Sequence, residues 1–163
     1  MEVQQRRGIR EKDEVPVMRF IDTNVLVYAA TTQDACKRKI AIELITHALE
    51  VKHDGVISVQ VMSEFSRTML AKKFVTVKEL DKWVSLFYPL LETEVTMDIV
   101  RQAALIQEEY GIQFYDAQIV ATAEKLGCTE IVSEDLNDGQ LYRGMAAVNP
   151  FKRKIQAEEA SGR

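Results

Sequence analysis

The sequence has 163 residues, the size of one domain with a single hydrophobic core. Its formal net charge of -4 argues against a protein that coats nucleic acid nonspecifically, although a local basic patch stays compatible with it. It has no apolar segment of about 18 residues and no signal-peptide pattern, so we expect a cytoplasmic protein with no membrane partner.

The two ends of the chain differ in composition from its middle. Residues 1–17 are polar and charged without hydrophobic periodicity, and we expect a flexible N-terminal extension there. Residues 18–150 carry the apolar patterns of one folded domain, and residues 151–163 form a C-terminal tail. We find no internal repeat and no linker that would divide the domain.

The domain begins with an apolar run that stops at an acidic residue. Phe20 and Ile21 favour a strand. The next three residues, Asp22, Thr23 and Asn24, are of the kind that leaves a sheet and caps a helix. Asp22 is therefore expected at the carboxyl end of a strand, where open α/β sheets bind their ligands. Taken alone, this stretch fits a simple helix N-cap equally well.

Helical and strand patterns alternate along the rest of the domain. Apolar residues recur at helical spacing in several segments, and short runs rich in β-branched residues separate them. The patterns predict helices at about 34–52, 59–73, 76–87, 97–110 and 114–126, and short strands at 56–58, 90–95, 129–133 and 146–148. This alternation predicts an α/β fold with three layers, in which helices cover both faces of a mainly parallel sheet of four to five strands.

Four acidic residues are expected at, or just beyond, the carboxyl edge of the predicted sheet. Asp22 ends the first strand, Asp135 follows the fourth, and Glu64 and Asp116 lie near the starts of predicted helices. Doubly wound topology can bring all four to one edge of the sheet. Two carboxylates about 4 Å apart repel by roughly 4 kcal/mol at an effective dielectric near 20, so four need compensation. Either some are protonated, or Mg²⁺ or Mn²⁺ ions lie among them.

A cation held by such acids lowers the pKa of bound water and stabilises charge on a phosphoryl oxygen, which is the chemistry of phosphodiester hydrolysis. The two histidines, His47 and His53, belong to an outer helix and its end, away from the four acids, so no histidine-based acid–base pair is available. Each acid also has a plainer interpretation. Glu64 fits a solvated helix residue, Asp116 a favourable charge at a helix start, and Asp135 a solvent-facing loop.

Four segments of the chain together carry a resemblance to a known family. In order and spacing, residues 20–28, 58–65, 115–123 and 131–140 resemble the PIN-domain ribonucleases, and most closely the toxins of VapBC-type toxin–antitoxin pairs. The resemblance covers about residues 18–149. It departs from the family pattern in the extension before Met18 and in the loop after Asp135, where many members have a phenylalanine.

The resemblance implies specific roles for residues of this sequence. Asp22, Glu64 and Asp116 would be the core metal-binding acids with Asp135 as the fourth, and the ion would be Mg²⁺ or Mn²⁺. Polar support would come from the neighbouring residues Thr23, Asn24, Ser133 and Asp138. The implied fold is a parallel sheet with flanking helices, and the implied activity is cleavage of single-stranded RNA, often by a homodimer that a small antitoxin silences.

Basic and aromatic residues supply candidates for contacts with substrate or partner. The phosphates of the RNA need cations near the acids, and the candidates are Arg38, Arg67, Lys72 and Lys73. Solvated helix faces explain the same charges. Four aromatic residues fit the core, an antitoxin groove or a dimer face: Phe74, Trp83, Phe87 and Tyr88.

Two other classes of function remain to be weighed. A scaffold that keeps the fold and binds RNA or protein without cleavage should have lost one or more of the acids, and none is lost. A phosphoacceptor site of the receiver or haloacid-dehalogenase kind also begins with an acid at a strand end. The dehalogenase pattern needs a second acid two residues after Asp22, where Asn24 stands, and the receiver pattern needs a late lysine that the segment 133–135 lacks.

Overall fold

The computed structural model describes residues 17–52 and 54–152. The predicted N-terminal extension and C-terminal tail lie almost entirely outside the described residues, and His53 lies outside them as well. Within the described part, no helix has the length and apolar character needed to cross a membrane.

The described residues form one six-stranded sheet in the order β3-β2-β1-β4-β6-β5. All neighbouring strands run parallel except the last pair, β6 and β5, which is antiparallel. The strands are β1 (Arg19–Ile21), β2 (Gly55–Ser58), β3 (Leu91–Thr93), β4 (Glu130–Val132), β5 (Leu141–Tyr142) and β6 (Met145–Val148). The predicted three-layer α/β fold with a mainly parallel sheet is confirmed, with one strand more than expected.

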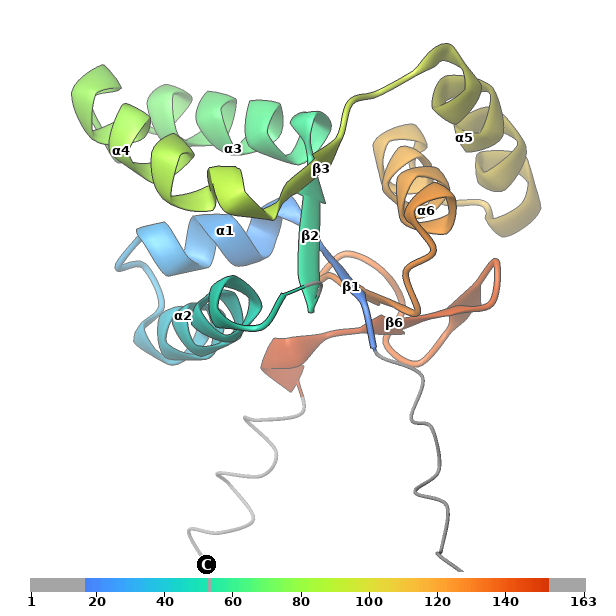
Figure 1. Cartoon of the computed structure of the whole chain (residues 1–163), viewed down its shortest axis with the longest axis horizontal. Helices are drawn as coiled ribbons and strands as arrows, with labels where there is room; N and C mark the ends of the chain where they lie inside the picture. The colour runs from blue at the N-terminus through green and yellow to red at the C-terminus, as the bar shows by residue number, and fades with distance from the viewer. Residues whose placement is uncertain (1–16, 53, 153–163) are drawn as a thin grey trace, which may run out of the picture.

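Helices cover both faces of this sheet. They are α1 (Thr23–Ala30), α2 (Ala35–Glu50), α3 (Val59–Ala71), α4 (Val77–Phe87), α5 (Met97–Tyr110) and α6 (Phe114–Leu126), with a short 3₁₀ helix, η1 (Tyr88–Leu90), after α4. Figure 1 shows α1 and α2 on one side of the strands and α5 and α6 on the other. The pair α3 and α4 packs beside α1.

Local sequence signals set the helix ends close to where the patterns predicted them. The side chains of Ser58, Thr76 and Thr96 each accept a hydrogen bond from a backbone N–H in the first turn of the following helix. Gly111 and Gly127 end α5 and α6 in the left-handed conformation, which glycine adopts without steric cost. These caps fix where α3, α4, α5 and α6 begin or end, and two of these helices, α3 and α6, carry acids of the candidate site.

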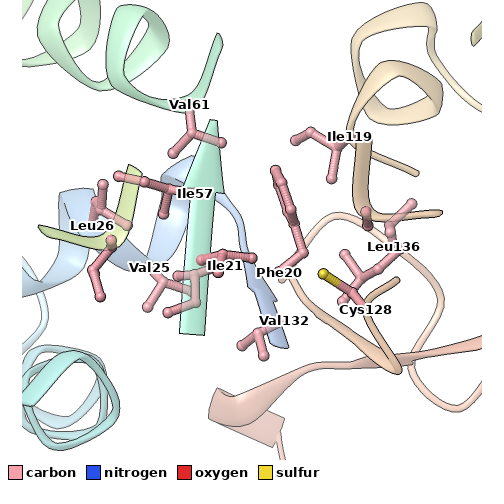
Figure 2. Close-up of a cluster of buried hydrophobic side chains, with 14 of the residues drawn as sticks. Phe20, Ile21, Val25, Leu26, Ile57, Val61, Ile119, Cys128, Val132 and Leu136 are labelled. Carbon is pink, nitrogen blue, oxygen red and sulfur yellow. The ribbon is translucent and has the colours of Figure 1, made fainter. Parts of the chain in front are cut away.

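The core lies on both sides of β1. Phe20 and Ile21 are fully buried and, as consecutive strand residues, they face opposite layers. Figure 2 shows Phe20 on the side of Ile119 from α6, and Ile21 on the side of Val25 from α1. Asp22 directly follows these two anchored residues, so the packing of the core fixes its backbone position.

The strand that the sequence did not predict is β5. It consists of two residues and is joined to β6 by a two-residue turn at Arg143 and Gly144, both of which have positive φ values, 49° and 83°. The hydroxyl of Tyr110 accepts a hydrogen bond from the backbone N–H of Arg143 at 2.9 Å. A contact from α5 therefore helps to hold a turn whose sequence lacks the usual asparagine–glycine signal.

The four aromatic residues of the α4 region separate into three environments. Phe87 is fully buried and stacks on Trp83, with ring centroids 5.6 Å apart. Trp83 and Phe74 are half-buried and line a surface groove of about 460 Å³. Tyr88 is 68% exposed. Phe87 thus belongs to the core, whereas Phe74, Trp83 and Tyr88 are available in part at the surface.

Candidate active site

The four acids that the sequence singled out line one pocket at the carboxyl edge of the sheet. Asp22 follows β1 and is the N-cap of α1, Glu64 lies in α3, Asp116 lies in the first turn of α6, and Asp135 follows β4. The pocket has a volume of about 290 Å³. Its lining consists of Asp22, Thr23, Asn24, Val27, Tyr28, Gln33, Glu64, Thr68, Lys72, Asp116 and Asp135.

Asp22 is the most deeply placed of these acids, with 4% of its surface exposed. Its Oδ1 accepts the backbone N–H of Thr23 at 2.6 Å, and its Oδ2 accepts the hydroxyl of Ser133 at 2.6 Å. The side-chain amide of Asn24 donates to the same Oδ2 at 3.2 Å. These donors fix the carboxylate in one orientation toward the pocket.

The residues next to Asp22 also tie the other acids to it. The hydroxyl of Thr23 donates to Glu64 Oε2 at 3.3 Å. The amide of Asn24 donates to Asp135 Oδ2 at 3.1 Å, and its Oδ1 accepts the backbone N–H of Glu134 at 3.4 Å. A short polar segment at the start of α1 therefore holds acids from α3 and from the loop after β4.

Burial, with a smaller contribution from the neighbouring like charges, disfavours the charged forms of the pocket acids. Burial raises the pKa of Asp22 from 3.8 to about 7, with smaller increases from the charges of Asp135 and Asp116, while the hydrogen bonds from Ser133 and Thr23 lower it. Burial also raises the pKa of Asp116, helped by the charges of Asp135 and Glu64. A positive charge placed among these carboxylates would relieve both effects.

Five other residues were proposed from the sequence for support or substrate binding. Asp138 accepts the backbone N–H of Asn149 at 2.9 Å and is not part of the pocket lining. Lys72, which caps the end of α3, lines the acidic pocket. The remaining candidates Arg67, Lys73 and Arg38 are exposed and do not line it. Arg38 borders a separate depression beside α2.

Sequence reasoning missed four residues that line the pocket and one that braces it. The four lining residues are Val27, Tyr28, Gln33 and Thr68. Thr68 stands midway between Glu64 and Lys72 at steps of four residues, a helical spacing that could have revealed it. Lys37 pairs with Glu134 and donates to the Tyr28 hydroxyl at 3.0 Å, so its charge is used within the protein.

His47, the histidine that the structure describes, does not line the pocket. His47 Nδ1 lies 2.9 Å from Asp54 Oδ2, and Arg19 donates to both oxygens of Asp54 at 2.7 Å. Asp54 precedes β2, at the amino end of the sheet. His47 therefore contacts an acid, but one at the opposite end of the strands from the four acids.

The comparison with protein-family models decides the family. The model described as the PIN domain matches residues 19–142, which is most of the chain. The chain belongs to the PIN-domain family. All four acids of the pocket lie inside the matched region of this PIN domain.

Solved structures with the same fold include proteins of toxin–antitoxin systems. The PIN domain superposes on a chain of a toxin–antitoxin complex from Klebsiella pneumoniae with a TM-score of 0.59 at 19% identity, covering 81% of this chain and 97% of that one. It superposes on a chain of VapBC2 from Rickettsia felis with a TM-score of 0.57 at 16% identity, covering 82% of this chain and 98% of that one. VapC20 of Mycobacterium tuberculosis is a toxin that cleaves the sarcin–ricin loop. Its superposition has a TM-score of 0.54 at 19% identity and covers 69% of this chain and 86% of that one. Comparison with curated proteins gives no match.

The donor set of the pocket can be compared with what a metal ion requires. Within residues 17–52 and 54–152, no three His, Cys, Asp or Glu side chains stand close enough together to bind an ion as they are placed. Among the described residues, the pocket lining nevertheless offers four carboxylates and neither histidine nor cysteine. Oxygen-only donors fit a hard divalent cation such as Mg²⁺ or Mn²⁺ better than zinc. A cation bound beside Asp22 would favour the charged form of this acid, which burial disfavours.

Replacing Ser133 by alanine tests how the PIN domain holds its deepest acid. Ser133→Ala removes the hydroxyl that donates to Asp22 and that accepts the backbone N–H of Asp135 at 3.0 Å. We expect a further rise in the pKa of Asp22 and a loss of about 1–3 kcal/mol in the free energy of unfolding at pH 8. NMR titration and chemical denaturation measure these quantities.

Ser66→Ala is the matched control, because Ser66 is half-buried and its hydroxyl donates only to the backbone oxygen of Met62 in its own helix. The control should leave the titration of Asp22 unchanged. An Asp22 pKa that is the same in Ser133→Ala and wild type would contradict the assigned role of the serine.

Proposed function

We propose that this PIN domain is a metal-dependent endoribonuclease that hydrolyses phosphodiester bonds of single-stranded RNA in the cytoplasm. The observation that supports it is the convergence of four carboxylates, from segments after β1, β2 and β4 and at the start of α6, on one pocket. Acids that serve only as helix caps or solvated side chains have no reason to converge in this way.

The residues that would hold Mg²⁺ or Mn²⁺ are the pocket acids Asp22, Glu64, Asp116 and Asp135. When bound, the ion supplies an activated water and stabilises negative charge on the phosphoryl oxygen. The protein's own part is to hold these carboxylates against their mutual repulsion. Thr23, Asn24 and Ser133 do this through the hydrogen bonds that they donate to Asp22, Glu64 and Asp135.

The substrate would approach along α3. Glu64, Thr68 and Lys72 follow one another at steps of four residues and all line the pocket, so they form one edge of it. Lys72 is the proposed phosphate-binding residue, since a cation beside an acidic pocket attracts the RNA backbone. Arg67 and Lys73 lie beside this edge in sequence, and we assign them weaker, longer-range attraction of the RNA. Arg38, beside α2, would act only at a distance.

The proposal extends to control by a partner. Solved structures with this fold include toxin–antitoxin complexes and the toxin VapC20, which supports a toxin of a type II toxin–antitoxin pair. A small antitoxin would lie against the half-buried aromatic groove of Phe74 and Trp83 and place a basic side chain near the acids. We also propose a homodimer, to which the exposed Tyr88 could contribute apolar contact.

The test is cleavage of a labelled single-stranded RNA with Mg²⁺ or Mn²⁺, with excess EDTA, and with Asp116→Asn. We expect cleavage only with the added cation, and loss of it in Asp116→Asn. Asp81→Asn is a matched control, because Asp81 is an exposed acid on α4 outside the pocket lining. Cleavage that survives both EDTA and Asp116→Asn would exclude this mechanism. Binding of RNA without any cleavage by wild type would favour a scaffold function.

A further inference from the structure

Two buried glutamines form a hydrogen-bonded chain directly behind Glu64. Gln60 of α3 and Gln118 of α6 are 7% and 6% exposed. The side-chain amide of Gln118 donates to Gln60 Oε1 at 2.6 Å, and the amide of Gln60 donates to Glu64 Oε1 at 2.8 Å. The Gln60 amide also donates to the backbone oxygen of Tyr115 at 3.2 Å. The chain thus links α6 to an acid on α3.

The first bond of this chain determines the direction of the second. A glutamine side chain has an accepting end and a donating end and can rotate to present either. Because Gln118 donates to the oxygen of Gln60, the nitrogen of Gln60 is left facing Glu64 and Tyr115. With these two acceptors, both hydrogens of the Gln60 amide have partners. Gln118 therefore orients Gln60, and of the two glutamines it is Gln60 that contacts Glu64.

The bonds also hold the two acids relative to one another. Tyr115 directly precedes Asp116, so the bond to its backbone oxygen ties the first turn of α6 to α3. Glu64 is held from two sides, by Gln60 on Oε1 and by Thr23 on Oε2. A glutamate that would otherwise sample several rotamers is thereby fixed with its remaining lone pairs toward the pocket.

An amide suits this position better than other side chains would. A pair of apolar residues could fill the space between α3 and α6 without the cost of burying polar groups, so packing alone does not require glutamine. A lysine would donate to Glu64 as well, but its full charge would compete with a cation for the pocket. A neutral donor orients the carboxylate and leaves its charge for the cation.

We propose that Gln60 is a positioning residue, oriented by Gln118, that preorganises Glu64 and the Asp116 segment for binding a divalent cation. This inference rests on the proposed nuclease function. Groups behind a metal ligand commonly change metal affinity or activity by about 10- to 100-fold when removed. The glutamine chain is therefore expected to act on metal affinity more than on stability.

The experiment measures Mn²⁺ affinity by calorimetry in the full chain for wild type, Gln60→Met, Gln118→Met and the double variant. Gln60→Met should weaken Mn²⁺ binding about 10- to 100-fold. Gln118→Met should weaken it less, because Gln60 remains but is free to rotate. The double variant should match Gln60→Met, since Gln118 acts only through Gln60. RNA cleavage at saturating Mn²⁺ gives a second readout and should recover in large part.

Controls separate this role from a structural one. Gln107→Met changes an exposed glutamine on α5 and should leave Mn²⁺ affinity unchanged. Circular dichroism and thermal unfolding check the fold. Each single variant leaves the other glutamine without the hydrogen bond that joins the two, whereas the double variant removes both glutamines together. In the metal-free wild type, NMR should show slow hydrogen exchange for the Gln60 side-chain amide, and Gln118→Met should accelerate it.

The outcomes distinguish this inference from the function on which it rests. Wild-type Mn²⁺ affinity in a folded Gln60→Met overturns the positioning role and leaves the proposed nuclease intact. Additive losses in the double variant overturn the assignment of Gln118 as acting through Gln60. A wild-type protein that neither binds Mn²⁺ nor cleaves RNA overturns the proposed function, and the positioning role with it.

Discussion

Asp22→Asn is expected to lower RNA cleavage by about a thousandfold while leaving the PIN domain folded and more stable than wild type at pH 8. Asp22 is buried and its pKa is raised to about 7, so at pH 8 the wild-type protein holds a charge that its surroundings disfavour. Asparagine removes that charge with almost no change in volume. Loss of function and gain of stability should therefore occur together.

The local hydrogen bonds allow this substitution. The asparagine oxygen can accept the backbone N–H of Thr23, which now donates to Asp22 Oδ1. The new amide would then face the hydroxyl of Ser133, which can accept as well as donate. The amide of Asn24 would have to turn, because it now donates to the same oxygen. The fold is thus retained, whereas the negative charge proposed to hold the cation is lost.

Asp54→Asn is the matched control, because Asp54 is another acid next to a strand, is partly buried, and lies at the opposite end of the sheet. It accepts two hydrogen bonds from Arg19, so its replacement should lower stability and leave cleavage intact. Cleavage rates and chemical denaturation at pH 8 measure the two effects. Near-normal cleavage by Asp22→Asn would remove Asp22 from the proposed mechanism.

The placement of the acids in one pocket could be predicted because it follows from topology. Asp22 and Asp135 each follow a parallel strand, and parallel strands align their carboxyl ends. The helix limits were also accessible, since caps such as Thr76 with Glu79 and the glycine at 111 are short-range signals. Both features depend on residues that are close in sequence or on a general rule of sheet geometry.

The features that the sequence did not predict depend on contacts between distant segments. Gln60 and Gln118 are separated by 58 positions in sequence, and their bond exists only because α3 and α6 meet beside the sheet. The turn at Arg143 is held by the hydroxyl of Tyr110, again from another element. Periodicity describes which face of a helix is buried, but it does not identify the polar partner opposite that face.

The contribution of Asp22 to the stability of the metal-free protein is expected to fall as pH rises from about 4 to about 7. The ordinary pKa of an aspartate is 3.8, and burial raises that of Asp22 to about 7. Between these values the folded protein keeps a proton that the unfolded chain has released, so raising the pH favours unfolding. The contribution of Asp22 amounts to about 4 kcal/mol across this window and is constant above it. The raised pKa of Asp116 adds to the same trend.

The measurement is the free energy of unfolding from chemical denaturation in EDTA, at intervals from pH 4 to 8, for wild type and Asp22→Asn. The difference between the two isolates Asp22 from every other titrating group. It should change steadily across the window, with wild type losing stability relative to the variant. If the free energies of unfolding of wild type and Asp22→Asn changed in parallel with pH, the pKa of Asp22 in the folded protein would be that of an ordinary aspartate.

Adding Mn²⁺ at pH 8 links this pH dependence to function. A cation that binds only the folded protein stabilises it by about 2.7 kcal/mol at a hundred times its Kd, which would restore much of what ionisation of Asp22 removes. Asp22→Asn should gain far less from the same Mn²⁺, because the charge that attracts the ion is gone. If both proteins gained equally, the ion would bind elsewhere, and the repulsion among the pocket acids would serve some other purpose than holding a metal.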